Sequence, residues 1–345
     1  MLRKPATNPA IDPESLRQCG LFAGHGAEEL ADICQYMRPV RAKVGSRLFT
    51  QGEPADGLYV VKEGQVRIVS RLPGDRLVEL GRIGPGELFG EVALVIHSQH
   101  STTAEVTKSF SGCFFSRMHF DMLRSDMRPS AFRTMNAITE TVCGRIRGQV
   151  DEIRASLPPG RRAPRTPRQA PHRPPARAAP GKSGDLFGLE QLRRLPLFQP
   201  YTEAELRALV GRLRTRHLPR GAALIAPGDP PGRCLLVVRG ALRLGVQRGA
   251  AHEQAGILGP SQMAGQLALM DGRPEPLLCE ARETADVLEL SRAQFEALRA
   301  AADPLAFKFF ESVNQSLVAL LRRNNRLLSL LAVQGRLPQR ARQST

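Results

Sequence analysis

The sequence predicts a mainly β protein with additional helices, built from two jelly-roll (double-stranded β-helix) domains. Three glycines of the first copy return 176 positions later in the second, as Gly45, Gly52 and Gly64 and then Gly221, Gly228 and Gly240. Short β-prone runs separated by glycine turns follow in both copies, which is typical of jelly rolls and small barrels. A repeat as long as a whole domain indicates two domains rather than a solenoid.

A proline-rich basic segment separates the two copies. Each copy begins with a short helix, continues through strands and a glycine-containing loop, and ends in amphipathic helices. The expected organisation is a tail at 1–14, a first domain at 15–155, a linker at 156–187, a second domain at 188–335 and a tail at 336–345. The linker has few large apolar residues, so we expect it to be disordered and extended.

The basic charge lies mainly in two stretches of the chain. The chain carries a net charge of +16, of which 155–187 and the stretch from Arg322 onward each contribute +6. These two stretches, 156–187 and 322–345, are candidate surfaces for weak, nonspecific contact with an anionic partner such as nucleic acid or membrane. The alternative that the arginines only solubilise a tether stays open.

The remaining features argue against an enzyme or a membrane protein. There is no signal-peptide pattern and no stretch that could span a membrane, so we expect a cytoplasmic protein. The six cysteines form no CxxC pair, which favours reduced thiols. No catalytic triad, carboxylate pair, phosphate loop or metal-ligand spacing is visible, so we expect no catalytic residue, no metal site and no required cofactor.

Two stretches of the first copy carry a family resemblance. GSRLFTQGEPADGLYVVKEGQV (45–66) and GPGELFGEVAL (84–94) resemble the cyclic-nucleotide-binding domain of catabolite-activator-type regulators and protein kinase A regulatory subunits. GAALIAPGDPPGRCLLVVRGAL (221–242) and GPSQMAGQLALM (259–270) are similar but weaker. The resemblance implies a regulatory protein that acts through protein–protein interaction with a partner that the sequence does not identify.

The resemblance also implies a phosphate-binding cassette in the first copy. In the family, backbone N–H groups and an arginine hold the cyclic phosphate, and a glutamate binds the ribose 2′-hydroxyl. The candidate ligand-binding residues are Phe89, Gly90, Glu91, Val92, Ala93, Leu94, His100, Thr102, Thr103 and Ala104. The arginine is missing, and either Thr102 or His100 takes its place. Its loss costs about 1.5–3 kcal/mol, so we expect weak binding of a cyclic nucleotide, or a nucleoside-like ligand held through Glu91.

The second copy departs further from the family pattern. Its degenerate cassette consists of Gly265, Gln266, Leu267, Ala268 and Glu275. Gln266 stands in place of the glutamate and Glu275 in place of the arginine, where a carboxylate would repel a phosphodiester. Arg273 could instead turn inward, but a solvated turn residue is favoured. We therefore expect this copy to be a pseudo-receptor domain.

The last helix carries a heptad pattern that predicts a parallel homodimer. Apolar residues and one asparagine alternate spacings of three and four, at Phe310, Val313, Leu317, Leu320, Asn324, Leu327 and Leu331. A single asparagine in such a seam fixes register in two-stranded coils. The alternative, in which the stripe packs on its own β-roll, stays open.

The function expected from the sequence is a non-enzymatic regulatory or scaffold protein. Its first domain would sense a nucleotide or nucleoside-like ligand, and its second would be a pseudo-receptor. The alternative is an electrostatic binder of nucleic acid or anionic membrane.

Overall fold

The computed structural model describes residues 11–71, 77–95, 99–126, 128–158, 187–249, 251–301 and 303–337. The chain forms two compact units, 1–142 and 143–345. The division falls inside helix α5 (Pro129–Ser156), rather than in the proline-rich linker, most of which lies outside the described residues. The physical reason is that arginines near the end of α5 bond within the second unit: Arg147 pairs with Asp271, and Arg154 donates to the Gln247 carbonyl at 3.2 Å.

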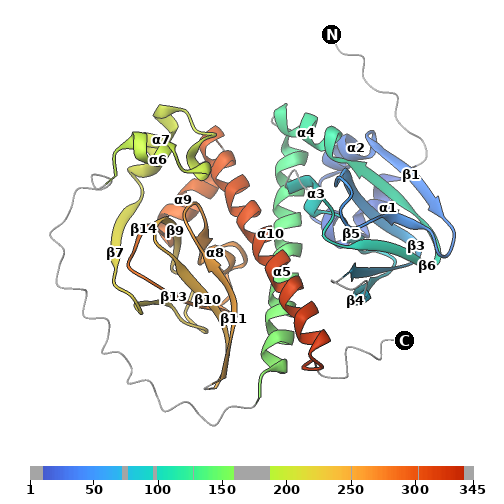
Figure 1. The fold of residues 1–345 in the computed structure, drawn as a ribbon. Helices are drawn as coiled ribbons and strands as arrows, with labels where there is room; N and C mark the ends of the chain where they lie inside the picture. The colour runs from blue at the N-terminus through green and yellow to red at the C-terminus, as the bar shows by residue number, and fades with distance from the viewer. Residues whose placement is uncertain are drawn as a thin grey trace. The chain divides into compact units, whose positions relative to one another are not determined.

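The first unit is a β-roll with helices on either side of it in sequence (Figure 1). Its strands are β1 (Met37–Ala42), β2 (Arg47–Phe49), β3 (Gly57–Arg71), β4 (Leu77–Ile83), β5 (Leu88–Phe89) and β6 (Thr103–Ser116). Its helices are α1 (Pro13–Arg17), the 3₁₀ turn η1 (Gly20–Phe22), α2 (Ala27–Cys34), α3 (Val92–Val95), α4 (Arg117–Ser125) and the start of α5. The path of the antiparallel sheet is β1-β6-β3-β4, with β2 paired to β6 and β5 to β3.

The second unit repeats this plan with its long strands divided. Its strands are β7 (Arg214–Leu218), β8 (Ala223–Ile225), β9 (Arg233–Arg239), β10 (Leu242–Arg248), β11 (Ala251–Leu258), β12 (Met263–Ala264), β13 (Leu278–Ala281) and β14 (Ala285–Ser291). They form two four-stranded sheets, β11-β10-β13-β8 and β12-β9-β14-β7. The helices are α6 (Leu189–Arg193), the 3₁₀ turn η2 (Pro196–Phe198), α7 (Glu203–Val210), α8 (Gln266–Asp271), α9 (Arg292–Ala301) and α10 (Pro304–Val333).

In each copy, a glycine with a positive φ allows a sharp bend between neighbouring strand segments of the roll. Gly64 has φ +93°, and a Cβ there would lie 2.1 Å from the Ser109 carbonyl oxygen, at a bulge between β3 and β6. Gly240 has φ +80° and stands between β9 and β10, with the Thr284 oxygen at 2.4 Å from such a Cβ. These positions admit only glycine, which is why the sequence repeat is clearest there.

The sequence-based expectation of two jelly-roll domains with flanking helices is confirmed. All six cysteines are buried and none forms a disulfide. Within the described ranges, every helix falls short of the length and hydropathy that a bilayer crossing requires. The predicted disorder of the linker concerns residues outside the described part of the chain and stays a prediction.

The glycine that precedes α8 provides a test of this local geometry. Gly265 has φ +81°, and a Cβ there would meet the Arg233 carbonyl oxygen at 2.3 Å. Gly265→Ala is therefore expected to destabilise the second unit by on the order of 1–3 kcal/mol, measured as a lower transition midpoint in calorimetry. The matched control is Gly259→Ala, because a Cβ there meets nothing within 4 Å. Equal effects of the two substitutions would contradict the strain argument.

Candidate functional site

The residues predicted for the cassette of the first copy lie on β5, on α3 and around the start of β6. Phe89 of β5 lies opposite Tyr59 of β3, and Ala104 of β6 lies opposite Phe49 of β2. Gly90 has φ +82°, with the Gly57 carbonyl oxygen only 2.8 Å from where its Cβ would be. The short helix α3, which contains Val92, Ala93 and Leu94, follows directly.

The glutamate of this cassette is buried. Glu91 is 1% exposed, a position from which its carboxyl could bind only a ligand that enters the roll. Thr103, also predicted for the site, is 9% exposed, and its hydroxyl accepts a hydrogen bond from the Gln51 amide at 3.0 Å. Thr103 therefore ties the cassette to the turn after β2.

Backbone hydrogen bonds relate His100 of the first copy to a residue of the second copy. The Gly52 amide donates to the His100 carbonyl (2.9 Å), and the His100 amide donates to the Glu53 carbonyl (2.8 Å). The second copy repeats this pair of bonds. There Gly228 donates to the Glu275 carbonyl (2.8 Å) and the Glu275 amide to the Asp229 carbonyl (2.9 Å). His100 therefore corresponds to Glu275, and Thr102 lies two residues further along the chain.

Aromatic rings occupy the interior of the first roll. The His100 imidazole lies flat on the Phe49 ring, with 3.7 Å between ring centroids and 2° between the planes. Tyr59 and Phe89 stack at 5.2 Å. Phe49, Tyr59, Phe89 and Phe110 belong to one buried cluster. Any ligand of this copy would contact aromatic faces and an imidazole instead of a guanidinium.

The second roll has smaller side chains at the same positions. Strand register pairs Leu235 with Ala264, where the first copy pairs Tyr59 with Phe89. Ile225 faces Cys279 where Phe49 faces Ala104, and Ala285 faces Leu218 where Phe110 faces Ala42. Four aromatic rings are thus replaced by two aliphatic side chains and two alanines, which leaves space inside the roll.

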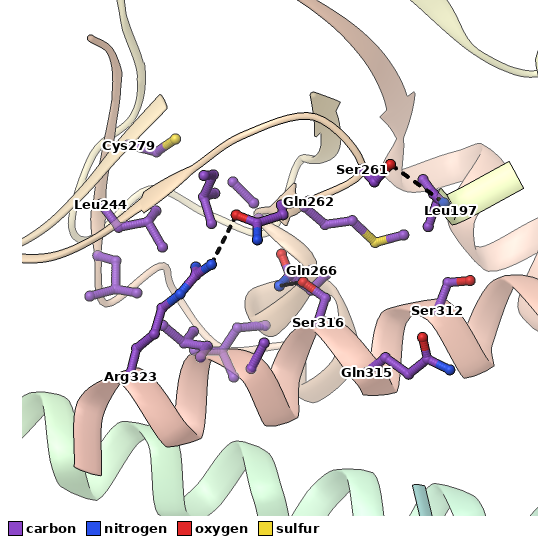
Figure 2. A pocket seen from close by; sticks show the side chains of 18 of the residues that line it. Leu197, Leu244, Ser261, Gln262, Gln266, Cys279, Ser312, Gln315, Ser316 and Arg323 are labelled. Carbon is purple, nitrogen blue, oxygen red and sulfur yellow. Dashed lines mark hydrogen bonds between the residues drawn. The ribbon is translucent and has the colours of Figure 1, made fainter. Parts of the chain in front are cut away.

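That space is a cavity of about 420 Å³ within the second unit. Its β-roll walls are mainly apolar and include Ile225, Leu244, Leu258 and Leu277. Helix α10 lines the other side with Ser312, Gln315, Ser316 and Arg323. Figure 2 shows Arg323 directed from α10 toward Gln262, and Ser316 beside Gln266. The cavity is of a size that suits a small organic molecule.

Two hydrogen bonds join α10 to the cassette loop. The Gln266 side-chain amide donates to the Ser316 hydroxyl at 3.0 Å. The Arg323 guanidinium donates to Gln262 Oε1 at 2.9 Å (Figure 2), and burial lowers the pKa of Arg323, with a further contribution from Arg326. Gln266, predicted as part of a degenerate cassette, therefore has a defined role as a contact between the cassette and the last helix.

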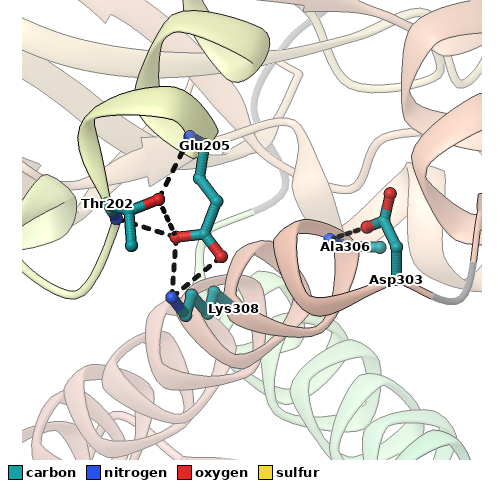
Figure 3. Close-up of polar contacts among 5 residues, drawn as sticks. All are labelled: Thr202, Glu205, Asp303, Ala306 and Lys308. Carbon is teal, nitrogen blue, oxygen red and sulfur yellow. Dashed lines mark hydrogen bonds and ion pairs between the residues drawn. The ribbon is translucent and has the colours of Figure 1, made fainter.

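An ion pair holds the other basic side chain of the lining. Lys308 Nζ lies 2.9 and 2.7 Å from the two carboxylate oxygens of Glu205. Glu205 also closes the capping box of α7 with Thr202 (Figure 3). The hydrogen bond from Lys308 is the main reason that the pKa of Glu205 is lowered. The positive charge of Lys308 is thus matched at the mouth of the cavity.

Glu275 is the unusual titratable group of this site. It is 7% exposed and lines the cavity. Burial raises its pKa to about 7, although Arg147 lowers it, and Asp271 and Asp229 raise it further. Near neutral pH the carboxyl is therefore partly protonated and can donate a hydrogen bond. Arg273 is exposed, as expected for a solvated turn residue.

Sequence reasoning missed the cavity itself and the part that α10 plays in it. The replacement of aromatic by small residues in the second copy was visible, but its effect on volume depends on the strand register. The polar residues of α10 gave a weak signal, since Ser312, Ser316 and Arg323 recur at helical spacing beside the apolar stripe.

The heptad residues are largely buried within the single chain. Val313, Leu317 and Asn324 are 0% exposed, Leu331 is 1% and Leu320 is 5%, whereas Phe310 and Leu327 are half-buried. The Asn325 side chain also accepts a hydrogen bond from Gln149 of α5. These side chains are thus covered within the chain, while the predicted dimer and its alternative, packing on the β-roll, both stay predictions.

The arginine-rich end is partly folded. Besides the bond of Arg323 to Gln262, Arg336 Nη2 lies 2.7 Å from Glu253 Oε2. Burial lowers the pKa of Arg322. These contacts leave fewer arginines for an anionic partner than the sequence suggested. The linker arginines and the last residues lie outside the described chain, so the electrostatic alternative stays a prediction. No candidate metal cluster occurs among the described residues.

The fold defines a class of proteins with two tandem β-rolls of the jelly-roll type. A family model for the cyclic nucleotide-binding domain matches residues 39–126 and 215–302. The chain therefore belongs to the cyclic nucleotide-binding domain family, as a tandem member with relatives among regulatory proteins.

Two relatives are similar over part of their length. A CRP-like cAMP-activated global transcriptional regulator of Mycobacterium tuberculosis is 30% identical over 112 residues, which cover 32% of this chain and 49% of the relative. The cAMP-dependent protein kinase type I-alpha regulatory subunit of Mesocricetus auratus is 33% identical over 66 residues, 19% of this chain and 40% of the subunit. The chain thus spans half or less of the length of these relatives.

Two solved structures are also similar to this chain. The regulatory domain of Toxoplasma gondii PKA, crystallised with cAMP, is 18% identical, with a TM-score of 0.32, and the match covers 86% of this chain and 94% of that one. A cyclic nucleotide-binding domain from Methylobacillus flagellatus is 26% identical, with a TM-score of 0.37, over 41% of this chain and 80% of that one.

The raised pKa of Glu275 predicts a pH dependence of stability. Because its pKa rises from 4.5 to about 7 on folding, the native state holds a proton that the unfolded state releases. The second unit should therefore lose stability as pH rises from about 4.5 to 7, by on the order of 1–3 kcal/mol. Glu275→Gln should remove this loss, so the variant gains stability over wild type at pH 8 but not at pH 4.

Calorimetry measures this stability through the unfolding transition of the second unit. That transition is recognised as the one whose midpoint Gly265→Ala lowers. The control is Glu283→Gln, because Glu283 is exposed in the same region. A constant difference between Glu275→Gln and wild type at both pH values would refute the assignment.

Proposed function

We propose that the protein is a non-enzymatic regulatory protein whose first β-roll senses a nucleotide or nucleoside-like ligand and whose second does not bind cyclic nucleotides. The observation that carries this proposal is the arrangement of the first cassette. Gly90 keeps its left-handed backbone, Glu91 is buried behind it, and the His100 imidazole lies on Phe49.

This arrangement favours recognition of a ribose and a ring over recognition of a phosphodiester. A buried carboxylate accepts hydrogen bonds from hydroxyl groups. An imidazole offers at most two donors and lacks the bidentate fork of a guanidinium. We therefore infer that cAMP binds the first roll weakly, and that an uncharged ribose-containing ligand loses less from the missing arginine.

The output of such a sensor would be a protein–protein contact. Ligand binding shifts a pre-existing equilibrium only if the ligand contacts the two states differently. In the first unit α4 and α5 follow directly after β6, the strand that begins at Thr103. A change at the cassette could therefore reach these helices through β6. We propose a cytoplasmic location, since the six cysteines are all unpaired, as is usual in reducing compartments.

Restoring the missing arginine tests the proposal. His100→Arg is expected to tighten cAMP binding by about ten- to a hundredfold, because it adds a charge-assisted phosphate contact. Thr102→Arg is the matched control, because the backbone bonds place His100, and not Thr102, opposite Gly52. Isothermal titration calorimetry with cAMP and with adenosine measures both.

Glu91→Gln in the His100→Arg background should reverse part of the gain, because the ribose loses a charged acceptor. Tight cAMP binding by the wild-type protein, unaffected by either arginine substitution, would overturn the proposal. So would an equal gain from Thr102→Arg.

We also propose a homodimer, through the C-terminal turns of α10 and not through the whole heptad. Leu330 and Val333 are 55% and 42% exposed, and Leu327 is half-buried beside them. Neighbouring exposed apolar side chains are a common feature of interaction surfaces. The residues farther along the heptad toward Val313 are already covered within the chain.

The dimer proposal predicts an effect of charge at these turns. The double variant Leu330→Lys, Val333→Lys should be monomeric at a protein concentration where the wild type is dimeric, measured by light scattering. Met118→Lys is the control, because Met118 is 65% exposed on α4. A wild-type protein that is monomeric at every concentration measured would end this proposal.

A further inference from the structure

The cavity of the second roll is a separate feature from the sensor of the first. It exists because small residues replace aromatic ones, most directly Ala264 in place of Phe89. Ala264 lines the cavity and is 3% exposed. A space of about 420 Å³ inside a protein lowers its stability. A ligand that fills this space would therefore stabilise the second unit.

The walls of the cavity favour an apolar body. Leucine, isoleucine and methionine side chains of the β-roll surround it, including Ile225, Leu244 and Met263. Cys279 adds a thiol whose pKa burial raises to about 12, so this group stays uncharged. Contact with such walls releases water from an apolar ligand, which is the main source of affinity in pockets of this kind.

The polar groups are arranged for hydrogen bonds instead of charge pairing. Gln266 and Ser316 already bond to each other, and Arg323 bonds to Gln262 (Figure 2). Each retains further donors: a second amide N–H on Gln266 and additional guanidinium N–H groups on Arg323. These could bind carbonyl, ether or hydroxyl oxygens of a ligand.

The charges of the lining do not favour an anion. The described lining contains two basic side chains, Lys308 and Arg323, and two acidic ones, Glu275 and Glu311. Glu205 holds the ammonium of Lys308 in an ion pair. Glu275 stands where the other copy has His100, so an anionic group placed there would meet a carboxyl.

We propose that this cavity is a binding site for an uncharged, largely apolar small molecule that accepts hydrogen bonds from Gln266 and Arg323. The inference goes beyond the proposed function, which concerns the first roll. It replaces the expectation of a purely structural second domain with that of a second ligand site of different chemistry.

Helix α10 gives such a site a means of acting. Six polar residues of α10 line the cavity, and the hydrogen bonds of Ser316 and Arg323 join this helix to the cassette loop. A ligand that binds the remaining donors of Gln266 or Arg323 changes the contacts made at this junction. Occupancy would therefore change how firmly α10 is held, which is a differential contact of the kind that a switch requires.

A matched pair of fluorescent probes tests, on the full-length protein, whether the cavity prefers an uncharged ligand to an anionic one. N-phenyl-1-naphthylamine is uncharged, and 1-anilinonaphthalene-8-sulfonate has the same ring skeleton with an added sulfonate. The uncharged probe should bind one saturable site with a blue-shifted emission. At pH 8 or above, where Glu275 is ionised, the sulfonate should bind at least about tenfold more weakly, because it meets the Glu275 carboxylate. Glu275→Gln should narrow that difference.

Variants locate the probe in the cavity. Ala264→Phe restores the ring that the first copy has at Phe89 and should abolish binding of the uncharged probe. Ala319→Phe, on the half-buried part of the α10 wall, provides a second block should the first variant fail to fold by circular dichroism. Ala297→Phe is the control, because Ala297 is exposed on α9, and it should bind like wild type. His100→Arg should also leave probe binding unchanged, which separates this test from that of the first roll.

Three results would overturn the inference. The first is no saturable binding of the uncharged probe. The second is binding that survives both Ala264→Phe and Ala319→Phe. The third is equal or tighter binding of the sulfonate, lost in Arg323→Gln, which would make the cavity an anion site.

Discussion

The close approach of the cassette glycine to a neighbouring strand is the constraint on which both candidate sites depend. Gly90 and Gly265 have φ near +80°, and a Cβ on either would overlap a carbonyl oxygen, of Gly57 or of Arg233. Only glycine lets the chain pass so close and then turn into a short helix. This contact fixes the position of the residue that follows, which is Glu91 in one copy and Gln266 in the other. The backbone of the site is thus conserved between the copies, while its chemistry is carried by side chains that are free to differ.

The ligand that each roll could accept depends on the volume of these side chains as well as on their charge. In the first roll, stacked rings leave His100 against Phe49, so a ligand would meet aromatic faces. In the second, alanine and aliphatic residues at the matching positions leave a cavity whose polar groups come from α10 and from Gln262, Gln266 and Glu275. The loss of the arginine therefore has different consequences in the two copies. At corresponding positions the first copy has the His100 imidazole, and the second has the buried carboxyl of Glu275, whose pKa rises to about 7.

The sequence was sufficient for the fold because the residues that determine it are local. Gly64 and Gly240 mark the corners of the rolls by their backbone conformation, and no side chain can substitute for them there. The cassette residues of the first copy were predicted from their order along the chain. Spacing did not decide between His100 and Thr102, and the correspondence of His100 with Glu275 became visible only through the backbone bonds of Gly52 and Gly228. The cavity could not be predicted either, because it results from cross-strand neighbours and from α10, about 50 residues further along the chain from Gln266.

Helix α10 shows why a heptad pattern alone does not identify the partner of a helix. Apolar spacing of three and four is needed for packing against any surface, whether a second helix or the helix's own β-roll. Val313, Leu317 and Asn324 are covered within the chain, yet the side-chain amide of Asn324 has no hydrogen-bond partner among the described residues. A buried amide without a partner costs about 1–3 kcal/mol, so Asn324 carries a local energetic cost. The same helix lines the cavity through Ser316 and Arg323. Because these two side chains are bonded to Gln266 and Gln262, a change at the cassette loop would reach α10 directly, and such a contact that differs between two states is what a regulatory element requires.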